Sequence, residues 1–129
     1  MEDYSLRSNV SCLNLAINVA KKSDYRVRHG AVVFKSGNPI STGFNKMKES
    51  VYTQLKDCWS IHAESDAIAK LRHNDDCDCV KDILVVRLNR GGSLVYSRPC
   101  DDCMIMLKEN NIRKVYYSDN DGLIRMEVL

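Results

Sequence analysis

The sequence lacks any apolar run of the length that crosses a membrane, and no basic segment followed by an apolar one stands near its start. A transmembrane helix needs about 20 consecutive apolar residues, and a secretory signal needs that order of basic and apolar segments. We therefore expect no membrane association and a cytoplasmic location. In a reducing cytosol, the six cysteines are expected to be metal ligands or free thiols instead of disulfides.

A strong excess of one charge is also missing. The 19 basic and 17 acidic residues leave a formal net charge of +2. Tight nonspecific binding to long nucleic acids needs many Lys and Arg contacts to phosphates, so this balance disfavours it. A single nucleotide or a local basic patch stays possible. Only two prolines and no low-complexity segment occur, so residues 1–129 are expected to form a single domain with its own core.

Hydrophobic periodicity predicts alternating helices and strands. Apolar residues recur every three or four positions in 5–22, which predicts an amphipathic helix. The segment 30–44 reads as two short strands joined by a turn, and 45–61 as a long, functional loop. The remaining expected elements are a helix from 63, a strand over 83–88, a helix over 101–110, a strand over 114–118 and a last strand over 123–129. This order predicts an α/β fold, a three-layer α/β/α sandwich with one mixed sheet of about five strands flanked by helices.

Two short motifs carry most of the chemical information: His62-Ala63-Glu64 and Pro99-Cys100-Asp101-Asp102-Cys103. Each opens a predicted helix, where free amides and the helix dipole favour thiolate. Zinc prefers tetrahedral nitrogen and sulfur ligands, and three protein ligands with a fourth position for water are typical of catalytic zinc. His62, Cys100 and Cys103 are therefore the predicted ligands of one catalytic Zn²⁺.

Glu64 lies two residues after His62 on the same predicted helix, so it is not expected to ligate the same ion. It can reach the water and the ring under attack, and its predicted role is to shuttle protons. The two motifs together are typical of zinc deaminases that act on cytosine or adenine. The alternative is a structural zinc site, which needs a fourth ligand and leaves Glu64 without a role.

On these motifs the chain resembles the cytidine/deoxycytidylate deaminase superfamily over roughly residues 5–122, and more closely the branch with deoxycytidylate and tRNA adenosine deaminases. Residues 28–33 are similar to the first strand of that family, and 41–45 to its second strand and the Asn that follows. The resemblance implies the cytidine deaminase-like sandwich. It also implies a homo-oligomer in which loops of neighbouring subunits complete the pocket.

The resemblance further implies the substrate contacts. Asn45 would hold the sugar or base, and the backbone of Ala63 would meet the base edge. Ser97 or Arg98 would lie beside the pocket. Two departures from the family pattern stand out. Residues 46–50 lack the Gly/Pro-rich continuation common in deoxycytidylate deaminases. The sequence after the turn at 119–122 is too short for the further helix and parallel strand that many members have, so we expect the last predicted strand to pair back on 114–118 as a hairpin.

The expected reaction is hydrolytic deamination of a free cytosine nucleotide, with dCMP as the preferred substrate, because weak charge and compact length favour a small molecule. The main alternative is a base within nucleic acid, either adenosine in tRNA or cytosine in single-stranded DNA. That alternative predicts a basic and aromatic groove leading to the zinc, made by Lys46, Lys48, Tyr52, Trp59 and Arg98. A noncatalytic zinc-binding partner subunit is the third possibility, against which the complete set of motif residues argues.

Three further groups have two readings each. Cys77 and Cys79, together with His73 and Cys58, could hold a second, structural zinc or lie as free thiols in a surface loop. Lys21, Lys22, Arg26 and Arg28 could hold a phosphate or form a solvated helix end. Tyr116 and Tyr117 end a predicted strand, where one should face the core and the other could face substrate. His29 is expected to be a satisfied polar residue at a strand start.

Overall fold

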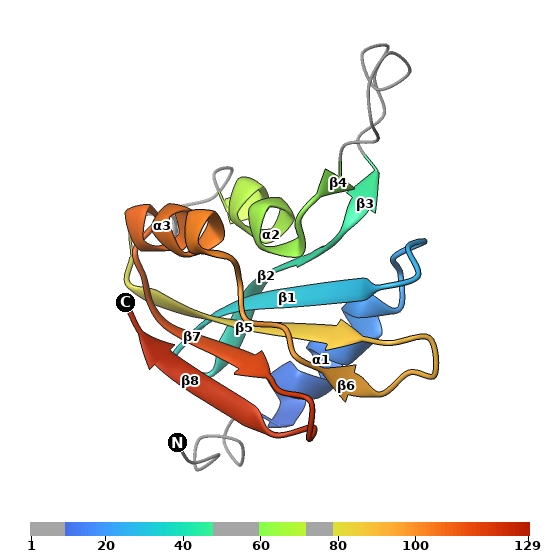
Figure 1. The fold of residues 1–129 in the computed structure, drawn as a ribbon. Helices are drawn as coiled ribbons and strands as arrows, with labels where there is room; N and C mark the ends of the chain where they lie inside the picture. The colour runs from blue at the N-terminus through green and yellow to red at the C-terminus, as the bar shows by residue number, and fades with distance from the viewer. Residues whose placement is uncertain (1–9, 48–59, 72–78) are drawn as a thin grey trace.

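The computed structural model describes residues 10–47, 60–71 and 79–129 (Figure 1). Its helices are α1 (Val10–Ala20), α2 (Ala63–Leu71) and α3 (Asp101–Glu109). Its strands are β1 (Arg28–Lys35), β2 (Asn38–Phe44), β3 (Lys46–Met47), β4 (Ser60–Ile61), β5 (Lys81–Leu88), β6 (Leu94–Val95), β7 (Ile112–Ser118) and β8 (Ile124–Val128). No helix in these ranges is long and apolar enough to span a membrane.

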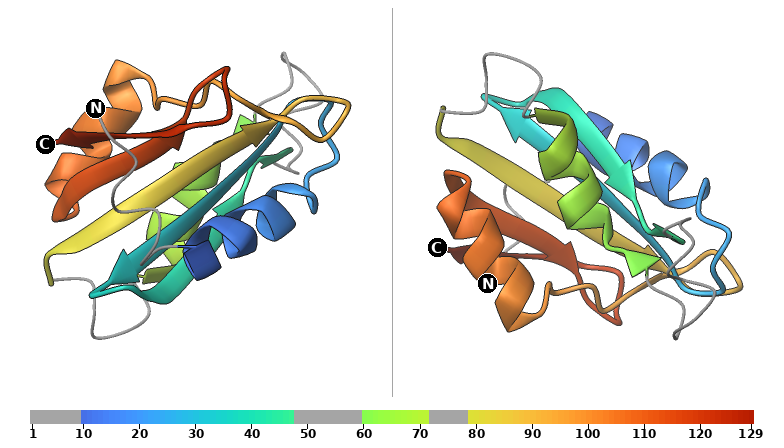
Figure 2. Two further views of the ribbon diagram at one scale, coloured as in Figure 1. Left: turned by 90° about the horizontal axis from the view of Figure 1, so that it is seen from below. Right: turned by 90° about the horizontal axis from the view of Figure 1, so that it is seen from above.

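Six strands form one mixed sheet in the order β2-β1-β5-β7-β8, with β6 paired to the end of β5. The β5–β7 pair is parallel and the other pairs are antiparallel. Helix α1 covers one face of the sheet, and α2 and α3 cover the other (Figures 1 and 2). The predicted three-layer α/β/α sandwich is confirmed, with the two-residue strand β6 as an addition.

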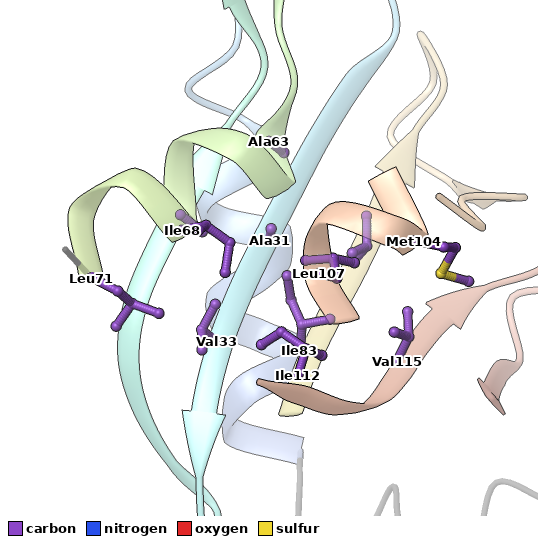
Figure 3. Close-up of a cluster of buried hydrophobic side chains, with 12 residues drawn as sticks. Ala31, Val33, Ala63, Ile68, Leu71, Ile83, Met104, Leu107, Ile112 and Val115 are labelled. Carbon is purple, nitrogen blue, oxygen red and sulfur yellow. The ribbon is translucent and has the colours of Figure 1, made fainter. Parts of the chain in front are cut away.

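Strands β1 and β5 are apolar on both faces because helices cover both sides of the sheet. On the α1 side, Val32, Leu84 and Val86 pack against Cys12 and Ala16. On the other side lies the cluster drawn in Figure 3, where alternate residues of β1 and β5 meet α2 and α3: Ala31, Val33, Ile83, Val85, Ala63, Ala67, Ile68, Leu71, Met104, Leu107, Ile112 and Val115.

Strand β8 pairs antiparallel with β7, with Ser118 opposite Ile124 and Lys114 opposite Val128. The predicted C-terminal hairpin is therefore confirmed. The turn between the two strands is closed by Asp119, whose carboxylate accepts the N–H groups of Asp121 and Leu123 at 2.9 and 3.0 Å. This hairpin forms the edge of the sheet on the α3 side.

The predicted loop 45–61 begins and ends in a small ladder, because β3 pairs antiparallel with β4. Lys46 stands opposite Ile61. The prediction of unbroken loop is wrong at these ends, since strands of two residues are too short to give a periodic pattern. The ladder brings Asn45, just before β3, next to His62, just after β4.

Two glycines let helices lie directly on the sheet. A Cβ at Gly30 would stand 2.3 Å from the carbonyl oxygen of Ala16 in α1. A Cβ at Gly43 would stand 2.4 Å from the carbonyl oxygen of Ala63 and 2.5 Å from the amide nitrogen of Ala67. Because these atoms of Ala16, Ala63 and Ala67 belong to the backbone, none of them can move aside unless its helix moves. Gly43 thus sets the position of the first turn of α2.

Replacement of Gly43 by Ala should therefore push α2 off the sheet. We expect Gly43→Ala to lower the free energy of unfolding by about 1–3 kcal/mol, the usual cost of overpacking, in a urea titration. Gly91→Ala is the matched control, because the nearest atom to a Cβ there is 3.5 Å away. Equal stability of the two variants would show that α2 does not depend on this close approach.

Candidate active site

A pocket of about 280 Å³ opens where α2 and α3 begin. Its wall is formed by the start of β1, the residue after β2, the starts of both helices and the segment that precedes α3. Its lining is His29, Asn45, His62, Ala63, Glu64, Ser97, Arg98, Pro99, Cys100 and Cys103. The predicted zinc ligands, the predicted proton carrier Glu64 and the four predicted substrate contacts (Asn45, Ala63, Ser97 and Arg98) all line this pocket.

His62, Cys100 and Cys103 form a cluster that could hold a metal ion. One ligand atom of each lies within 4.8 Å of the other two, and Nδ1 of His62 is 3.3 Å from Sγ of Cys103. Tetrahedral zinc with bonds of about 2.0–2.3 Å to nitrogen and sulfur separates its ligand atoms by about 3.5–3.8 Å. The donor types therefore fit zinc, and the separation between Nδ1 of His62 and Sγ of Cys103 is close to the one that zinc requires. Glu64 lines the pocket but is not part of the cluster.

The helix starts explain why these side chains are available to an ion. Cys100 is the N-cap of α3 and has extended backbone angles, but its side chain makes no capping hydrogen bond. Its carbonyl accepts the N–H of Met104 at 2.9 Å. His62 stands at the same position before α2, where its carbonyl accepts the N–H of Asp66 at 3.0 Å. The backbone closes both helix starts and leaves the side chains to face the pocket.

Burial dominates the electrostatics of the site. Glu64 is 5% exposed, and burial raises its pKa, against the lowering effects of its own backbone N–H and of His62. Burial, followed by the charges of Glu64 and Cys100, raises the pKa of the Cys103 thiol. The sequence-based expectation that the helix start lowers a thiol pKa is therefore not met at Cys103. A coordinated divalent cation reverses this balance and deprotonates a thiol outright.

Asn45 is buried, and its side chain joins two segments of backbone. Its Oδ1 accepts the N–H of His29 at 2.8 Å, and its Nδ2 donates to the carbonyl of Val27 at 3.0 Å. Each amide group can make a second hydrogen bond, so Asn45 can still contact a ligand. The clamp holds it rigidly at the pocket wall.

Ser97 lies at the pocket wall, but its hydroxyl is fully used inside the protein. Its Oγ donates to the carbonyl of Val85 at 2.8 Å, and it lies 2.8 Å from both the amide nitrogen and the Oγ of Ser118. A hydroxyl has one donor and two acceptor sites. What Ser97 offers to a ligand is therefore its backbone, and its side chain fixes the segment before α3 to β5 and β7.

Arg98 is held by the C-terminal hairpin. Its Nε and Nη2 bind the two carboxylate oxygens of Glu127 at 2.5 and 3.2 Å. The hydroxyl of Tyr117 donates to the same carboxylate at 2.8 Å, and burial and this carboxylate raise the pKa of Tyr117 to about 12. Glu127 was not singled out from the sequence, because one acidic residue in a short edge strand carries no local signal.

Of the two tyrosines of β7, one lies in the core and the other does not. Tyr116 is buried and its ring lies 5.8 Å from that of Phe34. Tyr117 packs edge-on against Tyr96 at 6.0 Å and supports Glu127, without lining the pocket. The core role expected of one tyrosine is confirmed, and the other binds Glu127, the partner of Arg98.

His29 is the pocket residue that the sequence led us to treat as merely polar. Burial, the charge of Arg87 and that of His62 lower its pKa to about 4, so its imidazole is neutral at physiological pH. It can then accept or donate a hydrogen bond without adding charge. The sequence signal that could have indicated a pocket position is its place directly before Gly30, at the start of a strand.

Several residues named from the sequence lie outside the described residues: Lys48, Tyr52, Cys58, Trp59, His73 and Cys77. Cys79 is described, and its Sγ lies 3.3 Å from Nζ of Lys35. Within the described ranges, Cys79 belongs to no cluster of potential metal ligands. Lys46 pairs with Asp66 at 3.0 Å.

Comparison with known proteins agrees with this geometry. The family model for the cytidine and deoxycytidylate deaminase zinc-binding region matches residues 7–119. No curated protein sequence matches the chain significantly.

Solved structures resemble the fold. A dCMP deaminase from the cyanophage S-TIM5, in complex with dCMP and dUMP, is 23% identical with a TM-score of 0.66, over 86% of this chain and 80% of that one. A cytidine deaminase from Burkholderia pseudomallei is 17% identical with a TM-score of 0.70, over 92% of this chain and 91% of that one.

Removal of one cluster ligand should release the metal. We expect purified protein to carry about one zinc per chain, and Cys100→Ser to weaken zinc binding by more than about 100-fold, since even loss of an outer-shell partner costs about 10–100-fold. Metal analysis after dialysis against a weak chelator measures both. Cys79→Ser is the control and should keep its zinc. Full zinc in Cys100→Ser would remove Cys100 from the ligand set, and two zinc ions per chain would indicate the second site.

Proposed function

Because the chain belongs to the cytidine and deoxycytidylate deaminase family, whose model matches residues 7–119, we propose that it deaminates a free cytosine nucleotide, converting dCMP to dUMP with release of ammonia. The observation that carries this proposal is the position of buried Glu64 in the same pocket as the cluster of His62, Cys100 and Cys103. We propose that it works as one domain and, by analogy with its family, as a homo-oligomer.

His62, Cys100 and Cys103 are the proposed zinc ligands, and the three-ligand set leaves one position for a nonprotein ligand. Zinc in such a site supplies a water whose pKa is lowered to about 7, and so a nucleophile at neutral pH. The two thiolates offset the charge of the cation. A purely structural zinc has four protein ligands, and the cluster within the described residues has three.

Glu64 is the proposed general base and acid. It accepts a proton from the attacking water and donates one to ring nitrogen N3 as oxygen bonds to C4 of cytosine. It then carries the second proton to the amino group, the bond from C4 to nitrogen breaks, and ammonia leaves. Water and cytosine are consumed, uracil and ammonia are formed, and Glu64 ends unchanged. A buried carboxylate suits this role because it is held in place and shielded from bulk water.

The walls of the pocket support a base-sized ligand. Its volume of about 280 Å³ is close to the smallest volumes of small-molecule sites, about 300 Å³. We propose that Asn45 contacts the sugar or base and that the first turn of α2 offers the backbone of Ala63 to the base edge, since N–H groups there have no partner within the helix. Ser97 would contribute backbone and Arg98 one edge of its guanidinium.

Two of the basic residues expected to line a nucleic-acid groove, Lys46 and Arg98, lie within the described residues, and their ion pairs favour a free nucleotide over a polymer. Lys46 pairs with Asp66, and Arg98 pairs with Glu127. Each of these cations therefore has a carboxylate partner, which Lys46 shares with Lys70. A strand of nucleic acid binds through positive charge that is free to meet its phosphates, and these ion pairs reduce the charge that Lys46 and Arg98 offer.

The substrate can be tested directly by ammonia release from the zinc-loaded protein. The panel is cytidine, deoxycytidine, CMP, dCMP, adenosine, a single-stranded DNA containing one cytosine, and a tRNA anticodon hairpin. We expect the highest kcat/KM on dCMP. Turnover of a polymer alone would reject the free-nucleotide proposal, and no turnover of any substrate would reject deamination.

Replacement of Glu64 by Gln keeps the shape of the side chain but removes the group that carries protons. We expect Glu64→Gln to lower kcat by about 10²–10⁴-fold, the usual contribution of general acid–base catalysis, with zinc content unchanged. Glu109→Gln, at the exposed end of α3, is the matched control and should retain full kcat. Near-normal turnover of Glu64→Gln would reject the proton shuttle.

A further inference from the structure

A second, open hollow of about 450 Å³ lies at the same end of the sheet as the pocket. It is lined by Arg26, Val27, Arg87, Asn89, Arg90 and Gly91. One wall is the segment between α1 and β1, and the other is the turn between β5 and β6; these lie side by side in Figures 1 and 2. Nη2 of Arg28 donates to the carbonyl of Asn89 at 3.0 Å, which ties the two walls together.

A strand register and a hydrogen bond place this hollow beside the pocket. His29 of the pocket stands opposite Arg87 of the hollow in the β1–β5 ladder, so their side chains lie on the same face of the sheet. Val27 of the hollow accepts a hydrogen bond from Asn45 of the pocket at 3.0 Å. A ligand whose base enters the pocket between His29 and Asn45 therefore has the hollow next to its remaining part.

The hollow carries positive charge that its own lining does not neutralise. Arg26, Arg87 and Arg90 contribute a guanidinium each, and no lining residue is acidic. Among the residues that the structure describes, the arginines that form ion pairs all lie elsewhere: Arg98, Arg113 and Arg125. The three arginines of the hollow therefore differ from these, because none of them has a carboxylate partner within the described residues.

Arg87 has donors to spare. Its Nε is buried and has no hydrogen-bond partner among the described residues, and Nη1 makes one long hydrogen bond, at 3.5 Å, to the carbonyl of Tyr96. A buried donor without a partner is costly to the folded state. The guanidinium fork matches the oxygens of phosphate, to which it binds with two parallel hydrogen bonds.

From this charge and this position we propose that the hollow binds the phosphate ester of the nucleotide whose base lies in the pocket. The inference rests on the proposed function and adds to it the residues that recognise phosphate. The ester is a monoester in a free nucleotide and a diester in a strand. Both present the same negatively charged oxygens to the arginines.

The test compares two double variants of the zinc-loaded full chain. Arg26→Ala with Arg90→Ala removes two charges from the hollow and leaves Arg87 beside the pocket in place. Lys108→Ala with Arg113→Ala removes the same charge from exposed positions at the other end of the sheet. We expect the first to raise the KM for dCMP at least about tenfold, as for loss of charge-assisted hydrogen bonds, and to leave deoxycytidine unchanged. The second should change neither.

The source of the phosphate is separated by a second substrate, a single-stranded DNA containing one cytosine. A rise in KM confined to dCMP assigns the hollow to the monoester, and a rise confined to the DNA assigns it to the diester. Equal KM values of the two double variants on both phosphorylated substrates would overturn the proposal.

A binding measurement separates this inference from the proposed reaction. We expect calorimetry with 2-deoxyribose 5-phosphate to show binding to the unmodified protein and to the Lys108/Arg113 variant, and at least about tenfold weaker binding to the Arg26/Arg90 variant. This result without deamination of any substrate would reject the reaction and keep the phosphate site. Deamination of dCMP with equal sugar-phosphate binding by all three proteins would keep the reaction and reject the site.

Discussion

The candidate site depends on the contact of α2 with the backbone of β2 at Gly43. There the carbonyl of Ala63 and the amide of Ala67 come closer to the strand than any side chain would allow. The residues at either side of Ala63 are His62 and Glu64, so this contact sets the depth of a proposed zinc ligand and of the proposed proton carrier together. The β3–β4 ladder then brings Asn45 to the same place from the other side. Backbone packing, which is stiff, thus positions the groups that need accurate placement.

The opposite wall of the pocket is held by polar groups instead. Ser97 is bound to Val85 and Ser118, and Arg98 to Glu127. These partners belong to β5, β7 and β8, so hydrogen bonds and an ion pair attach the segment before α3 to these three strands. Cys100 and Cys103 follow directly after it. The edge hairpin therefore contributes to the site without lining it, because it fixes the segment that presents the two thiols.

Much of this was predictable from the sequence, and the missing parts have physical reasons. The long periodic segments predicted the sandwich. The two motifs predicted His62, Glu64, Cys100 and Cys103 as site residues, because local spacing at a helix start determines where those side chains point. Ser97 and Glu127 act through partners distant in the chain, and no local pattern records such pairs. The pKa of Cys103 also differed from expectation, since burial by distant residues outweighs the local effect of the helix start.

The same reasoning explains how the proposed site can separate chemistry from recognition. Carboxylates bind the cation that lines the pocket and the one that follows Asn45: Glu127 binds Arg98, and Asp66 binds Lys46. A free cation there would attract phosphate to the reacting centre and compete with the base. In the neighbouring hollow the arginines have no such partners among the described residues, and His29, whose imidazole is neutral, lines the pocket opposite Arg87 of the hollow. If the hollow binds phosphate as proposed, a ligand with an uncharged base at one end and a negative charge at the other is oriented before any bond changes.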